Sequence, residues 1–148
     1  MKKNKINIAL IFLLLLLLVI IRFIENKLFY DPFYDFFKGN FFSQSIPKIS
    51  NLSLFFSFFV RYTLNSIISI SIIYLIFLNK NLLKFLILVY VFLFIILIIS
   101  FYVFLYGYFI DWQVVFYVRR FIIQPLFLIL FIPALFYQKV YGNDKITG

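Results

Sequence analysis

The fourth apolar stretch of this chain begins with FYVRRFIIQP (residues 116–125) and stays apolar as far as Gln138. Its adjacent arginines, Arg119 and Arg120, stand near the start of a run that is long enough to cross a membrane. A charged side chain at the centre of a bilayer costs roughly 2.5–3.5 kcal/mol on insertion scales. The pair therefore indicates a membrane protein in which arginine has a task at one end of a helical bundle.

The composition of the 148 residues is that of an integral membrane protein. Hydrophobic residues make up 66% of the chain and charged residues 13%, whereas soluble domains have about 25% charged residues. The chain has no Cys and no His, which removes the usual thiolate and imidazole bases, nucleophiles and metal ligands. We therefore expect no metal site, no cofactor and no enzymatic activity. The net charge of +9 comes from residues at the ends of apolar runs, so nucleic acid is not an expected partner.

Four apolar runs predict an all-α, polytopic membrane protein that forms a single membrane domain over residues 1–148. The expected transmembrane helices are residues 6–24, 54–78, 82–106 and 114–137, with an outer loop at 25–51 and a flexible tail at 138–148. The first run follows three lysines, as in a signal peptide, but no small-residue cleavage site follows it, so we expect a retained helix. Pro125 and Pro133 predict kinks in the fourth helix.

The outer loop contains signals for a short helix. Asp31-Pro32 is typical of a helix start, with Asp31 as the N-cap and Pro32 as the first helical residue, and Gly39-Asn40 is typical of a helix end. Such a helix would place Asp31, Asp35 and Lys38 on one side and aromatic side chains on the other, which suits a helix lying in the membrane interface. The alternative is an irregular loop whose aromatic rings sit at the level of the lipid headgroups.

The distribution of lysine predicts the orientation in the membrane. The segments on the N-terminal side of the bilayer hold Lys2, Lys3, Lys5, Lys80, Lys84, Lys139 and Lys145, and the other side holds Lys27, Lys38 and Lys48. Because positively charged loops stay in the cytoplasm, we expect both termini inside, N-in and C-in. The arginines of the first, second and fourth helices then gather near the outer face.

Two polar stripes at helical spacing run through the apolar helices. One consists of Ser57, Arg61, Asn65 and Ser69, and the other of Gln113, Tyr117, Arg120 and Gln124. Polar stripes in membrane helices face a bundle interior or a partner helix. Since adjacent residues point about 100° apart on a helix, only one arginine of the pair can follow the second stripe. By its spacing, that residue is Arg120.

These patterns define a candidate anion or partner site and its counter-charges. Guanidinium groups are forks that match phosphate or carboxylate, so the candidate site residues are Arg61, Asn65, Arg119, Arg120 and Gln124. The candidate counter-charges on the outer face are Glu25, Asp31, Asp35 and Asp111. The alternative is that the arginines only anchor the helices at the membrane interface and pair with these acids.

Short motifs along nearly the whole chain resemble the exosortase F system-associated membrane proteins of Bacteroidota. They are FYDPF (29–33), RYTLN (61–65), FYVRRF (116–121), QPLF (124–127) and PA (133–134). The resemblance implies a small protein of the bacterial inner membrane that accompanies an exosortase, an enzyme that processes C-terminal sorting signals. Exosortases are thought to use Cys, Arg and His, and this chain lacks two of the three.

The expected function is therefore that of a non-catalytic accessory subunit of an exosortase-type sorting system. It would hold the enzyme or its substrate through the outer arginine cluster, with membrane lipid and an exosortase-like protein as partners. One alternative is a component that binds or transports an anionic lipid or polymer anchor. The other is a purely structural membrane assembly protein, which would tolerate replacement of the arginines.

Overall fold

The computed structural model of this protein describes residues 2–39, 47–108, 110–124 and 126–141, and all regular elements in these ranges are α-helices. The prediction of an all-α chain is confirmed for this part. The helices are α1 (Lys2–Leu28), α2 (Phe33–Lys38), α3 (Asn51–Phe77), α4 (Lys80–Tyr106), α5 (Trp112–Ile123) and α6 (Leu126–Tyr141). The helix α6 continues past Gln138, and the rest of the predicted tail, from residue 142, lies outside the described residues.

Three of the described helices are long and apolar enough to cross a bilayer. They are α1 over Lys5–Glu25, α3 over Asn51–Phe77 and α4 over Lys80–Tyr106. The helices α5 and α6 meet the same criterion only as a pair, and their axes differ by 68°. The described residues therefore provide three continuous candidate spans, or four if the bent pair crosses the membrane as one, which is compatible with a multi-pass membrane protein.

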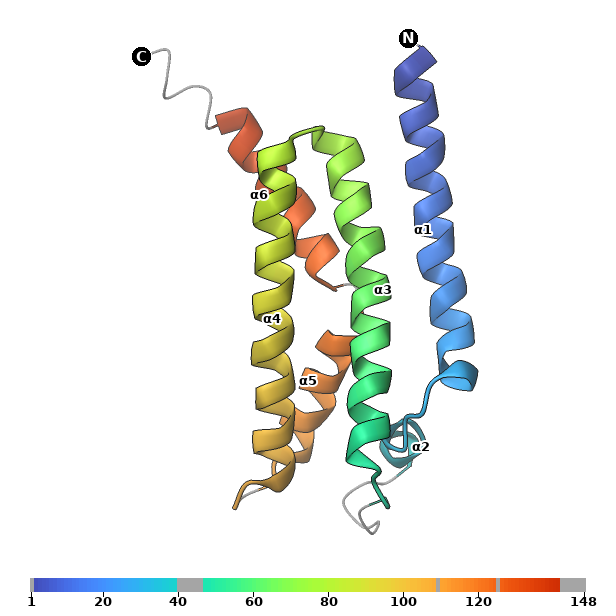
Figure 1. Cartoon of the computed structure of the whole chain (residues 1–148), viewed down its shortest axis with the longest axis vertical. Helices are drawn as coiled ribbons and strands as arrows, with labels where there is room; N and C mark the ends of the chain where they lie inside the picture. The colour runs from blue at the N-terminus through green and yellow to red at the C-terminus, as the bar shows by residue number, and fades with distance from the viewer. Residues whose placement is uncertain (1, 40–46, 109, 125, 142–148) are drawn as a thin grey trace.

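The helix α3 is the centre of the bundle. It packs against α1, α4, α5 and α6, and Figure 1 shows it standing between α1 and α4. In its most apolar window 44% of the residues are buried inside the protein, compared with none in the corresponding window of α1. The exposed apolar surface of α1 is what a helix surrounded mainly by lipid requires. The polar stripe on α3 faces inward as predicted, because Ser57, Arg61, Asn65 and Ser69 are all buried.

The short helix α2 closes one end of the bundle. Its Phe33 and Phe36 are buried, and they contact the rings of Phe101 in α4 and Trp112 in α5 at centroid distances of 5.7 and 5.0 Å. The expected helix therefore forms, but its aromatic side packs on the protein. The prediction that Asp31 caps this helix is wrong: α2 has no side-chain cap.

The fourth apolar run is broken after Ile123. The helix α5 ends there, Gln124 has extended backbone angles, and α6 begins at Leu126. Pro125 itself lies outside the described residues, but proline has no N–H to continue a helix. The expected interruption is therefore a bend between two helices, whereas α6 continues through Pro133 without a break.

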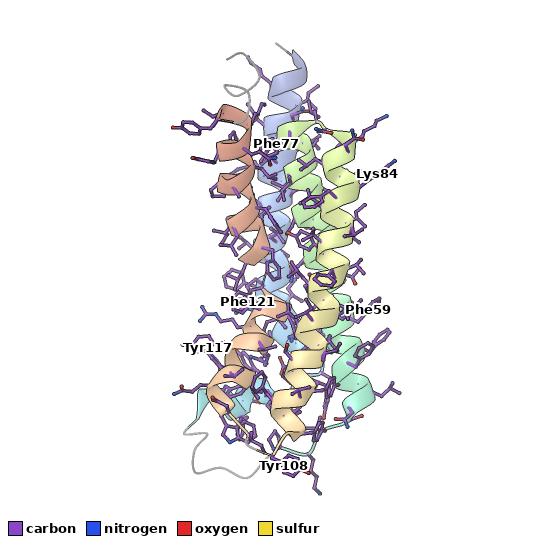
Figure 2. All side chains as sticks on the ribbon, turned by 90° about the vertical axis from the view of Figure 1, so that its left-hand side faces the viewer. Phe59, Phe77, Lys84, Tyr108, Tyr117 and Phe121 are labelled. Carbon is purple, nitrogen blue, oxygen red and sulfur yellow. The ribbon has the colours of Figure 1, made fainter. Side chains whose placement is uncertain are left out.

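All four arginines lie toward one end of the bundle, together with lysines such as Lys38, whereas the described cations at the other end are lysines. Figure 1 places α2, the start of α3 and the start of α5 at one end, and the start of α1 and the end of α6 at the other. We call the first the arginine end, after Arg22, Arg61, Arg119 and Arg120, and the second the lysine end, after Lys5, Lys80, Lys84 and Lys139. Figure 2 shows Lys84 and Phe77 at the lysine end and Tyr108 at the opposite tip.

The connection between α3 and α4 is a tight turn at the lysine end. Leu78 has a left-handed backbone, with φ 52° and ψ 34°, and its N–H donates to the carbonyl of Tyr74 at 2.7 Å. The Asn79 side chain accepts from the amides of Asn81 and Leu82, at 2.9 and 3.3 Å, and so caps α4. The turn itself consists of Leu78 and Asn79, and Lys80 already belongs to α4.

Candidate functional site

The centre of the arginine end is a buried carboxylate shared by two arginines. Arg61 Nη1 donates to Asp31 Oδ2 at 2.8 Å. Arg119 donates from Nε to both Asp31 oxygens, at 3.1 and 3.2 Å, and from Nη2 to Oδ2 at 2.5 Å. The exposed fractions of the side chains are 0% for Arg61, 3% for Asp31 and 7% for Arg119. One carboxylate thus connects the segment before α2 with α3 and α5.

The C-terminal part of α1 joins the same network. The carbonyl of Glu25 accepts from Arg61 Nη2 at 3.2 Å, and the Glu25 carboxylate forms an ion pair with Arg22. The guanidinium of Arg61 also lies over the Phe29 ring, 5.2 Å from its centroid. Glu25 is only 1% exposed. Because α1 is otherwise surrounded by few protein side chains, these polar contacts position its end against α3.

The predicted site residues lie in one region but have different tasks. Asn65 is buried and donates from Nδ2 to the carbonyl of Ile123, the last residue of α5, at 3.1 Å. Arg120 is exposed and donates from Nε to Gln124 Oε1 at 3.0 Å. Arg61 and Asn65 therefore hold the scaffold, whereas Arg120 and Gln124 are accessible.

Arg120 is the arginine that follows the second polar stripe, but this stripe does not face the bundle interior. Gln113, Tyr117 and Arg120 are all exposed on one face of α5, whereas Arg119 is buried. Figure 2 shows Tyr117 pointing away from the helix bundle. Of the two expected positions of the stripe, the bundle interior is therefore wrong, and a partner helix stays a prediction.

A cationic cavity of about 200 Å³ lies next to the shared carboxylate, between α1, α2 and α5. Its lining contains four cations and no carboxylate among the described residues: Arg22, Lys38, Arg119 and Arg120. The rings of Tyr34, Phe37 and Phe116 complete the wall together with Ile123 and Gln124. Arg119 thus contacts Asp31 through Nε and Nη2 and also lines the cavity, and no hydrogen bond joins its Nη1 to a described residue.

The four candidate counter-charges behave differently. Glu25 and Asp31 form ion pairs. Asp35 is exposed and makes no ion pair with a described residue. Asp111 caps α5 by accepting from the amides of Gln113 and Val114 at 3.0 and 3.3 Å. Only two of the carboxylates therefore neutralise the arginines.

Other parts of the described chain offer less chemistry. No group of three or more Asp, Glu, His or Cys residues in these ranges is able to hold a metal ion. A larger cavity of about 660 Å³ at the lysine end has mainly amide and apolar walls, with Asn79, Asn81, Gln138 and a single cation, Lys139. A cavity of about 710 Å³ beside Leu28 and Phe56 has an almost wholly uncharged lining. The cavity next to Arg119 is the one that concentrates charge.

The sequence does not indicate that Arg22 and Lys38 line one cavity together with the rings of Tyr34, Phe37 and Phe116. Arg22 and Lys38 are visible in the sequence as single charges, but they reach the cavity from α1 and α2 only through tertiary packing. Comparison with known proteins adds no family: no protein-family model, no curated protein and no solved structure matches this chain.

Proposed function

We propose that this protein is a non-catalytic membrane protein that binds a phosphate group of a membrane-embedded substrate or partner at the arginine end. The observation that carries the proposal is the cavity between α1, α2 and α5, whose lining holds four cations and no carboxylate among the described residues. Charged groups at such a position are costly unless they are paired. An anion that enters the cavity supplies the missing pairing.

The charge balance favours phosphate over carboxylate. Arg22 pairs with Glu25, but Arg61 and Arg119 share the single carboxylate of Asp31, so these three residues keep one positive charge. Arg120 and Lys38 form no ion pair with a described residue. The excess is therefore three positive charges. A phosphate monoester, with about −1.5 to −2 charges at pH 7, compensates more of this excess than a carboxylate does.

The size of the cavity indicates that only a headgroup enters. Pockets that enclose a whole drug-sized ligand measure about 300–1,000 Å³, and this cavity measures about 200 Å³. The remainder of the ligand would lie outside, along the apolar surface of the bundle. This arrangement suits a phosphate that is attached to a lipid or a lipid-linked anchor.

Three of the lining cations and Arg61 have distinct parts in the proposed site. Arg119 offers Nη1, and its orientation is fixed by the contact of Nε and Nη2 with the two carboxylate oxygens of Asp31. Arg120 is oriented by Gln124, which leaves its terminal nitrogens for the ligand. Lys38 lies 4.0 Å from the centroid of the Tyr34 ring and adds a point charge at the mouth. Arg61 does not line the cavity and acts as a positioning residue through Asp31.

A binding experiment tests this proposal. The purified protein in zwitterionic detergent is titrated with short-chain phosphatidic acid, phosphatidylcholine, inorganic phosphate and a peptide with a free C-terminal carboxylate, with calorimetry as the readout. We expect phosphatidic acid to bind and phosphatidylcholine not to bind. Arg120→Gln and Lys38→Gln should each weaken binding ~10–100-fold, the effect of losing one hydrogen bond to a charged group.

The matched control is Lys84→Gln, which removes an exposed cation at the lysine end and should leave the affinity unchanged. Binding of inorganic phosphate alone would indicate a free anion as ligand, and preference for the peptide would assign the site to a carboxylate. If the parent protein and the Arg120→Gln variant bind each of the four ligands with the same affinity, the proposal is contradicted. That result would favour a purely structural role for the arginines.

A second candidate function adds a protein partner. The resemblance of FYDPF, RYTLN and FYVRRF to exosortase-associated membrane proteins favours an accessory subunit in a bacterial inner membrane, with both termini in the cytoplasm and the arginine end outside. Asp31 of the first motif, Arg61 of the second and Arg119 of the third are the members of the shared ion cluster. Purification in mild detergent should then co-isolate an exosortase-like enzyme. A lone monodisperse protein, with sorting intact in its absence, would exclude this role.

A further inference from the structure

The break between α5 and α6 exposes backbone carbonyls in the middle of the bundle. In a continuous helix, the carbonyl of Ile122 would accept from the amide of Leu126 and that of Ile123 from the amide of Phe127. Here the amide of Leu126 donates to the carbonyl of Gln124 at 2.8 Å. The Asn65 side chain supplies a donor to Ile123 at 3.1 Å. The carbonyl of Ile122 has therefore lost its helical partner, and no side chain of a described residue donates to it as Asn65 does to Ile123.

Two residues with buried hydroxyl groups line a small cavity next to this break. Tyr90 Oη on α4 and Ser69 Oγ on α3 are both fully buried; they lie near enough to interact with each other, but neither makes a hydrogen bond of regular geometry in the described part of the chain. Both residues line a small cavity together with Asn65, Ser66 and Ile122. Buried polar groups without partners are rare in proteins, and each one requires an explanation.

The cavity has the size of a single water molecule. Its volume is about 10 Å³, which is at the threshold of about 10–15 Å³ at which one water fits. A buried water needs two to four polar partners. Tyr90 Oη and Ser69 Oγ provide two, and Ile122, whose carbonyl has lost its helical partner, also lines the cavity.

We propose that one water molecule occupies this cavity, bonded to Tyr90, Ser69 and the carbonyl of Ile122, and that it holds the bend between α5 and α6. Non-helical backbone at the depth of a bilayer is tolerated where it is buried in protein or in contact with water. The water and Asn65 would then satisfy neighbouring carbonyls at the end of α5. The helix that they hold carries Arg119 and Arg120, so the site supports the geometry of the cationic cavity without contacting its ligand.

Removal of either hydroxyl gives opposite results in a wet and in a dry cavity. If water is bound, Tyr90→Phe and Ser69→Ala should each lower the melting temperature by ~2–4 °C, the shift expected for one lost hydrogen bond. If the cavity is dry, both hydroxyls are unsatisfied, and their removal should leave the melting temperature unchanged or raise it. That second result would overturn the proposal. Tyr62→Phe calibrates the scale, because Tyr62 Oη donates directly to the carbonyl of Tyr90 at 2.8 Å.

The double variant and an experimental density map complete the test. Because both hydroxyls bond the same water, Tyr90→Phe combined with Ser69→Ala should cost less than the sum of the single changes, and full additivity would contradict a shared water. A map that resolves ordered water should show a peak between the two hydroxyl oxygens. A direct bond between Tyr90 and Ser69 with no peak would also overturn the proposal. These results do not depend on whether the arginine end binds phosphate.

Discussion

Replacement of Asp31 by Asn is the change with the largest effect that the structure indicates. Asp31→Asn keeps the size of the side chain but removes the negative charge that Arg61 and Arg119 share. All three side chains are at most 7% exposed, so water screens the loss only weakly. Removing one partner of a buried ion pair costs ~3–5 kcal/mol, because the other charge is left buried and unpaired. Since folded proteins are stable by only ~5–15 kcal/mol, this change should remove a large part of the stability.

The expected result is a melting temperature lowered by ~6–20 °C, at ~2–4 °C for each kcal/mol in a chain of this size. The single tryptophan of the chain, Trp112, is a suitable fluorescent reporter because its ring lies 5.0 Å from that of Phe36 in α2. Asp35→Asn is the matched control: Asp35 is an exposed residue of α2, close to Asp31 in the sequence, and its replacement should change stability by less than ~0.5 kcal/mol. If Asp31→Asn melts within 2 °C of Asp35→Asn, the conclusion that Asp31 neutralises two buried arginines is refuted.

The remaining predictions concern single positions. Arg119→Lys should destabilise the protein by ~2–4 kcal/mol, because lysine cannot make the bidentate contact with Asp31. Arg120→Lys should melt at the temperature of the parent protein but bind phosphatidic acid more weakly. Equal melting temperatures of the two variants would contradict the assignment of Arg119 as the buried arginine. Leu78→Gly should raise stability by ~0.5–1 kcal/mol, because φ is 52° and the side chain is 59% exposed, and chemical denaturation measures it. For the proposed topology, a single cysteine at Tyr108 should react with an impermeant thiol reagent on intact cells, and one at Asn81 should react only after lysis; the reverse order would invert the topology.

The helical part of the fold could be predicted because it depends on local properties of the sequence. Length and hydropathy are sufficient to locate α1, α3 and α4, and their lengths agree with what a bilayer requires. The ends of the helices are harder to predict than their existence. The helix α1 continues as far as Leu28 through charged residues, where hydropathy falls but hydrogen bonding and the contacts of Glu25 maintain the helix.

The identity of the candidate site residues could be predicted better than their roles. Arginine is costly among apolar residues, so its presence marks a site whatever the packing. Its partner is a different matter: Asp31 lies 30 residues from Arg61 and 88 from Arg119 in the sequence. Its position before Pro32 is typical of a helix cap, which is a local role. Only the tertiary arrangement shows that Asp31 pairs with the two buried arginines and does not cap α2.

The orientation of α5 illustrates what helical spacing leaves undetermined. Gln113, Tyr117 and Arg120 share one face of α5, as their spacing predicts, and Arg119 lies about 100° away from Arg120 around the axis. Spacing alone does not say which of these two faces enters the bundle. The face of Arg119 is buried because Asp31, 88 residues earlier in the chain, packs against it.

The most direct test of the proposed function is an experimental structure of the protein with short-chain phosphatidic acid bound. We predict that the phosphate lies in the cavity of about 200 Å³, within hydrogen-bond distance of Arg119 Nη1 and the terminal nitrogens of Arg120, with Asp31 still bonded to Arg61. A phosphate found in the larger cavity at the lysine end, beside Lys139 and Asn81, would contradict the assignment of the arginine end as the binding site.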